Sequence, residues 1–178
     1  KFDYMFDSGT NQFSQSLNGW TFSQPNTSLQ NMFASNTGFN GDIGDWDLTN
    51  VKNIQNLFNG ASSFNQNINN WDVTGLTSLS FLFGNASSFN QPLNNWDVSN
   101  ISNIQGLFNG ASSFNQNINN WDISKVTSLS SIFKNATSFN QPLNNWNTSK
   151  VTDFNSIFSA ANSFNQDISS WDFSAVTI

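Results

Sequence analysis

LFNGASSFNQNINNWD, at residues 57–72, is the stretch that decides the fold, because it recurs without a change at residues 107–122. Its tryptophan belongs to a set spaced by 25 residues, and Trp20 lies 26 residues before the first member. The set is Trp46, Trp71, Trp96, Trp121, Trp146 and Trp171. A repeat of this length is typical of a solenoid, in which each repeat forms one coil and contacts only its neighbours.

The composition excludes several classes of function. The chain has 178 residues, a formal charge of −6, and no Arg, His, Glu or Cys. Nucleic acid is not an expected partner, because phosphate binding needs clustered basic residues and the five Lys are scattered. Zinc, copper and haem lack their usual ligands, and catalytic triads that need His or Cys are excluded. No apolar run approaches the roughly 18 residues of a membrane span, so we expect no membrane insertion by this segment.

The apolar residues around Trp71 predict a short strand in each coil. Ile68, Trp71 and Val73 fit the L-x-x-L-x-L spacing of leucine-rich repeats, and Leu76 extends it. Trp71 and Val73 are two residues apart, so in a strand they share one face while Asp72 lies on the other.

Beyond this strand, the spacing of the apolar residues changes to that of a helix. Positions i, i+3, i+4 and i+7 are apolar, which indicates about two helical turns: Leu79, Leu82, Phe83 and Ala86. Thr77 precedes them as an N-cap. Residues that tolerate a left-handed helix end follow successive tryptophans at a fixed distance: Gly60, Asn85, Gly110 and Asn135.

The predicted fold class is therefore an α/β repeat solenoid that resembles leucine-rich repeats. It would have about seven coils of 25 residues, with one short strand and one short helix per coil. Residues 1–178 would form a single solenoid fragment. Because neither end carries an evident polar cap, we expect the fragment to be excised from a longer repeat array.

The repeat also resembles a known family. Its pattern, [MLI]-F-x-x-A-x-x-F-N-x-x-[IL]-x-x-W-[DN]-x-[ST], is similar to the BspA-like leucine-rich repeats of bacterial surface proteins, which overlap a mycoplasma-type lipoprotein repeat family of unknown function. The match extends from Met32 to Val176, with local departures such as Asn36 in place of Ala and Asn147 in place of Asp. The resemblance implies a cell-surface or secreted protein and carries over no catalytic residue.

Two interpretations compete for the tryptophans. Because Trp71 shares its predicted strand face with Val73, we expect all six regularly spaced tryptophans to form the structural core. The alternative is an exposed platform on which sugar rings stack.

The aspartates that follow the tryptophans are the candidates for a ligand face: Asp47, Asp72, Asp97, Asp122 and Asp172. We expect each to accept hydrogen bonds in a local turn with the Ser or Thr two residues on. The alternative is calcium, which takes carboxylate and amide oxygens. The best calcium candidate is the acidic cluster of Asp42, Asp45, Asp47 and Asn50, although it lacks the order of an EF-hand loop.

Asparagines also recur with the repeat, and we expect them to stack coil on coil through their side-chain amides. The alternative is an exposed polar surface for a glycan or peptide. Their two rows are Asn65, Asn90, Asn115, Asn140 and Asn165, and Asn70, Asn95, Asn120 and Asn145.

These features predict a non-catalytic binding or adhesion scaffold on the cell surface or in secretion. Its acidic, Asn-rich strand face would contact a protein or glycan of a host or neighbouring cell. An enzyme is not expected, because the aspartates repeat in near-identical settings whereas an acid and a base need different ones. The alternatives are a structural spacer in a larger surface protein and a calcium-dependent carbohydrate-binding module. No cofactor other than calcium is a candidate.

Overall fold

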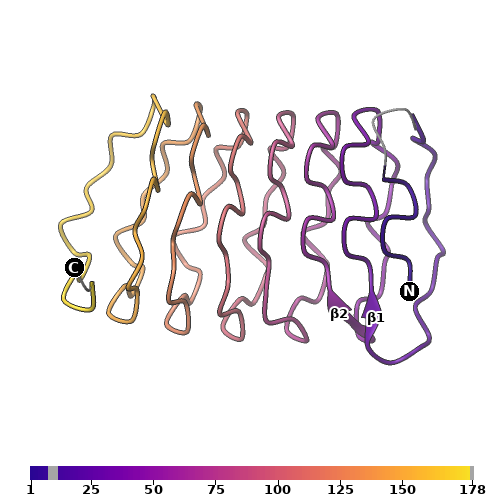
Figure 1. Ribbon diagram of the computed structural model, residues 1–178, viewed down its shortest axis with the longest axis horizontal. Helices are drawn as coiled ribbons and strands as arrows, with labels where there is room; N and C mark the ends of the chain where they lie inside the picture. Colours follow the sequence, from indigo (N-terminus) through magenta and orange to yellow (C-terminus); the bar gives the residue numbers. More distant parts are fainter. Residues whose placement is uncertain (8–11, 177–178) are drawn as a thin grey trace.

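The chain winds into a column of coils, each stacked on the next, with the two termini at opposite ends (Figure 1). The structure is a computed structural model, and it describes residues 1–7 and 12–176. Almost every long-range backbone hydrogen bond joins one coil to the coil beside it. The hydrophobic core is therefore a continuous strip along the axis of the column, bounded on both sides by polar turns.

Regular secondary structure is sparse. Strand β1 (Thr27–Ser28) pairs in parallel with strand β2 (Val51–Asn53), and isolated parallel bridges join Ser78 to Asn103 and Ser128 to Asp153. In residues 1–7 and 12–176 there is no other strand and no helix. The predicted α/β fold with one strand and one helix per coil is therefore wrong, and the chain is not a leucine-rich-repeat solenoid.

A ladder of turns occupies the segment that the sequence assigns to a helix. Alternate N–H groups donate to the neighbouring coil: Leu29 to Asn53, Asn31 to Gln55, Phe33 to Leu57 and Ser35 to Asn59, at 2.7–3.1 Å. The N–H groups between them donate three residues back in their own coil: Met32 to Leu29, Ala34 to Asn31 and Asn36 to Phe33. Within the ladder, about half of the backbone N–H groups thus find an acceptor in their own coil and half find one in the neighbouring coil.

Residues with positive φ explain why no helix forms. Two positions in each ladder adopt left-handed backbone, and Phe81 (φ 50°) and Asn85 (φ 54°) occupy them in the coil that follows Trp71. Both positions are the third residue of a turn, where a type II turn requires positive φ. A right-handed helix has no place for them. The left-handed residues Gly60, Asn85, Gly110 and Asn135 are thus internal turn positions and do not end a helix.

The predicted strand is also replaced by turns. The N–H of Trp71 donates to the carbonyl of Ile68 at 3.1 Å, and that of Leu76 donates to Val73 at 3.0 Å. Two successive turns leave no extended run between them. The apolar spacing nevertheless marks buried side chains, because Ile68, Val73 and Leu76 are at most 1% exposed.

Three columns of aromatic rings run along the core. The first joins Phe33, Phe58, Phe83, Phe108, Phe133 and Phe158, with ring centroids 5.7–5.9 Å apart. The second joins Phe39, Phe64, Phe89, Phe114, Phe139 and Phe164, at 5.8–6.1 Å. Tryptophans form the third, with centroids 5.8–6.5 Å apart in the stacked pairs 46–71, 71–96, 96–121 and 146–171. Offset stacking of this kind adds to the free energy of burying the rings.

Candidate functional site

The tryptophans lie in the core and offer no exposed platform. All six of the regular set are buried, and each indole N–H donates to a backbone carbonyl of the preceding coil. The bond from Trp71 Nε1 to the oxygen of Ile43 measures 3.1 Å. Because the rings are buried and their polar atoms are already bonded, they leave no face for a sugar.

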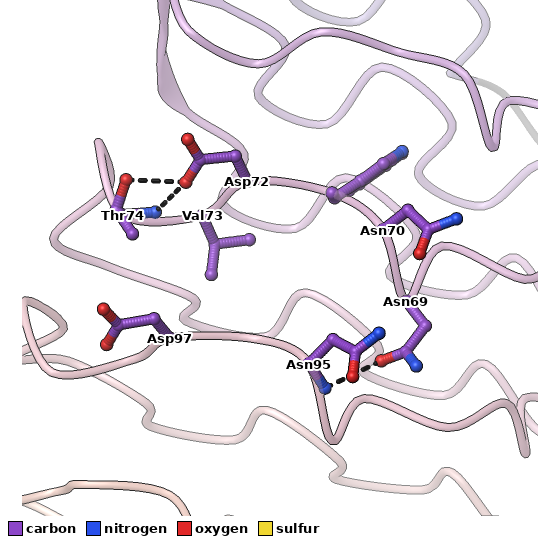
Figure 2. Close-up of a pocket in the computed structure, with 8 residues that line it drawn as sticks. Asn69, Asn70, Asp72, Val73, Thr74, Asn95 and Asp97 are labelled. Carbon is purple, nitrogen blue, oxygen red and sulfur yellow. Dashed lines mark hydrogen bonds between the residues drawn. The ribbon is translucent and has the colours of Figure 1, made fainter.

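The aspartates after the tryptophans form an exposed row, which we call the Asp row: Asp47, Asp72, Asp97, Asp122 and Asp172. Each carboxylate closes a local turn. Asp72 Oδ1 accepts from the backbone N–H of Thr74 at 2.9 Å and from its hydroxyl at 2.6 Å (Figure 2). The other members accept from the N–H two residues on at 2.8–3.0 Å.

These turns keep the Asp row ionised. The hydroxyl of Thr74, and then its backbone N–H, lower the pKa of Asp72 below its ordinary value, while the charges of Asp47 and Asp97 act in the opposite direction. The pKa of every other member is lowered in the same way by its own Ser or Thr. Hydrogen bonds to the charged form thus outweigh the repulsion between neighbouring coils.

A shallow pocket of about 320 Å³ lies between two coils beside the Asp row. Asp72 and Asp97 lie along one side of it, and Asn69 and Asn95 lie at its other end (Figure 2). Val73 lies between the two aspartates but is buried. The pocket therefore presents carboxylates and amides, which are groups that hydrogen-bond a sugar hydroxyl or a peptide amide.

The acidic cluster proposed for calcium is dispersed. Asp42 accepts from Asn18 and from the N–H of Gly44, whereas Asp45 accepts from the N–H of Gly19. The Asn50 amide donates to the carbonyl of Phe22 at 3.0 Å. Throughout residues 1–7 and 12–176, no three acidic side chains gather into a group that could hold a metal ion.

The first asparagine row is a structural ladder. The Oδ1 of each Asn accepts the backbone N–H of the equivalent Asn in the next coil, at 2.9 Å in all five steps from Asn40 to Asn165. A Gln from the next coil bonds to the same oxygen, as Gln91 does to Asn65 at 3.1 Å. From Asn40 to Asn140, the side-chain oxygens of this row are therefore occupied by the neighbouring coil.

The second asparagine row lies differently from our expectation. The side chains of Asn70, Asn95, Asn120 and Asn145 are exposed. Inter-coil bonds come instead from the residue before them, because the Oδ1 of Asn69 accepts the N–H of Asn95 at 3.0 Å and Asn119 does the same for Asn145. Sequence reasoning missed Asn69 and Asn119, since consecutive asparagines carry no signal that tells one role from the other.

In the part of the chain that the structure describes, no helix is long and apolar enough to span a membrane. Comparison with known proteins returns one family, described as a Mycoplasma protein of unknown function, DUF285, which matches residues 1–105 and again residues 77–178. No curated protein and no solved structure matches the chain. Because the two matches together span the whole repeat array, the chain belongs to this family of Mycoplasma proteins of unknown function, DUF285.

Proposed function

We propose that the chain is a non-catalytic binding scaffold of a cell-surface or secreted protein, and that the Asp row with its adjoining pocket contacts a protein or glycan partner. The observation that carries this proposal is the repetition of one exposed, ionised turn on successive coils. A partner with several equivalent groups gains avidity on such a surface, because each further contact forms within an existing complex.

The chemistry of the row supports binding more than catalysis. General acid and base catalysis by two carboxylates needs pKa values that differ. In the Asp row every pKa is lowered, and for the same cause. The carboxylates are also already oriented by their turns, so a partner meets them at little conformational cost.

The test replaces the charges of the row without changing its turns. Asn147 shows that this is feasible, because its Oδ1 accepts the N–H of Ser149 at 3.1 Å as an Asp would. The variant carries Asp72→Asn, Asp97→Asn and Asp122→Asn. We expect its binding to immobilised glycans and purified extracellular-matrix proteins to weaken by about tenfold or more relative to the wild type.

A matched control carries three Asp→Asn changes away from the row, at Asp3, Asp153 and Asp167. It loses the same charge, so equal weakening in both variants would reduce the effect to net charge and overturn the proposal. Absence of any binding by the wild-type chain across both panels would also overturn it and would favour the structural spacer, for which the continuous aromatic stack provides stiffness.

A further inference from the structure

One aromatic side chain interrupts a polar row on the ladder. Phe81 occupies the first left-handed position of its ladder, with a φ of 50°. Bulky residues seldom adopt positive φ, and where they do the strain often marks a binding site. The coils on either side carry smaller residues at this position, and the whole row is Tyr4, Asn31, Asn56, Phe81, Gly106, Ser131 and Ser156. Phe81 is therefore a departure from the repeat that the turn itself does not require.

The Phe81 ring lies outside the hydrophobic core. The residue is partly exposed, and it belongs neither to the core cluster nor to the partly buried hydrophobic residues packed against that cluster. In the part of the chain that the structure describes, no aromatic ring stacks on it, whereas Phe83, two residues later, stacks on Phe89 at 3.9 Å. The ring therefore contributes little to the core and can be reached by a ligand from solvent.

The following coil makes room for this ring and fixes its position. Gly106 is next in the row, and a Cβ there would collide with Cδ1, Cε1 and Cζ of Phe81. The ring thus rests against Gly106, while the N–H of Phe81 donates to the carbonyl of Gln105 at 2.9 Å. A ring that is already held in place loses little conformational freedom on binding, which favours affinity.

Uncharged hydrogen-bonding groups surround Phe81. Its ladder and the two beside it, residues 53–60, 78–85 and 103–110, contain no charged side chain. Asn56 precedes Phe81 in the row, and its N–H donates to the carbonyl of Ser80 at 3.1 Å. Among the described residues, the side-chain amide of Gln105 makes no hydrogen bond, and Asn56 Nδ2 donates none. Both amides are therefore free to bond a ligand.

We propose that Phe81 is the centre of a binding site for a neutral oligosaccharide. One sugar ring stacks its C–H face on the phenyl ring, and its hydroxyls bond to the side chains of Asn56 and Gln105. A charged ligand would find no opposite charge in these three ladder segments. The site shares no residue with the Asp row or its pocket, so this inference does not depend on the proposed function.

An extended peptide fits this surface less well than a sugar. A peptide adds to a sheet edge through free backbone groups. Here the backbone is already occupied, because the N–H groups of residues 81–84 all donate to carbonyls of their own coil or the next one. The groups that remain for a ligand are the phenyl ring and the side-chain amides, which suit a sugar.

The experiment removes the ring and keeps the turn. Phe81→Asn does so, because Asn31 and Asn56 hold the same position with φ of 56° and 55°. By NMR titration with cellohexaose, chitohexaose and maltohexaose, we expect the wild type to bind at least one of them with a Kd of about 1 mM. Phe81→Asn should bind that sugar at least about tenfold more weakly. Phe81→Tyr keeps a ring and should retain binding, whereas Phe81→Leu keeps only apolar bulk and should lose it.

The matched control is Ser131→Asn, which places the same residue in the same row two coils from Phe81 and should bind like the wild type. Added salt should leave binding unchanged, because a neutral sugar makes no ion pair. A wild type that binds none of the three sugars at about 10 mM would overturn the proposal. So would binding that survives Phe81→Leu, binding that salt abolishes, or an equal loss in Ser131→Asn.

Discussion

At the scale of single residues, the turn after each tryptophan forms with either a charged or an uncharged side chain at its first position. Asp72 and Asn147 occupy the same position, and each Oδ1 accepts the N–H of the residue two places on. An uncharged acceptor therefore completes the turn, and the carboxylates of the Asp row add a negative potential that the fold does not need. Because the fold does not need this negative charge, we propose that the charge serves to bind a partner at this face.

The pH dependence of stability follows from the same turns. Folding lowers the pKa of Asp72 and of the rest of the Asp row below the ordinary value of 3.8. The unfolded chain therefore takes up these protons first, so the stabilisation is fully present above about pH 4 and is lost as the pH falls through the lower folded values. Replacing all five aspartates by Asn should reduce the difference between the urea midpoints at pH 6 and pH 3. An unchanged difference would show that the turns do not discriminate between the charge states.

Burial of single residues was largely predictable, whereas their hydrogen-bonded roles were not. The apolar neighbours Ile68 and Val73 placed the six regularly spaced tryptophans in the core, and the exposure of these rings, at most 6%, agrees with this. It did not reveal that every indole N–H reaches the preceding coil, because the acceptor is a backbone carbonyl and has no sequence signature. The role of Asn69 was hidden for a similar reason, since Asn70 beside it is chemically identical.

At the scale of elements, the ladder imitates the periodicity of a helix. Leu79, Leu82, Phe83 and Ala86 are fully buried, as a helical stripe would be, yet they belong to successive turns. The first and last residues of each turn, Leu79 with Leu82 and Phe83 with Ala86, lie in the core, and their spacing equals that of a helical stripe. The distinguishing signal was the recurrence of Gly and Asn inside the stripe, at positions such as Asn56 and Gly106, because a helix disfavours glycine in its interior.

One pair of ladder residues should be energetically coupled. Phe81 and Gly106 occupy the same left-handed position in neighbouring coils, and a Cβ on Gly106 would run into the ring of Phe81. Gly106→Asn should therefore lower the free energy of unfolding by about 1–3 kcal/mol through overpacking. In a Phe81→Asn background the loss should shrink, because Asn31 and Asn56 already stack at this position with φ of 56° and 55°.

Urea unfolding of the wild type, both single variants and the double variant measures this coupling as a double-mutant cycle. Additive effects would contradict it, because they would place the cost in the backbone conformation of Gly106 and not in the ring above it.

At the scale of the whole molecule, stability should be a sum over boundaries between coils. Each coil bonds only to its two neighbours, and the three aromatic columns repeat the same contacts at every step. A column of this kind tolerates the loss of complete coils, provided that the register at the junction is kept. The identity of residues 57–72 with residues 107–122 supplies such a junction.

Deletion of residues 73–122 joins Asp72 to Ile123 and removes two complete coils without changing any local sequence at the boundary. We expect the shortened chain to fold with buried, blue-shifted tryptophans and to unfold cooperatively at a lower urea concentration, because fewer boundaries contribute. Deletion of residues 73–84 is the matched control, since it removes less chain but joins Asp72 to Asn85 and shifts every later side chain out of its column. If the smaller deletion proved the more stable of the two, the energy of the molecule would not reside in the register between coils.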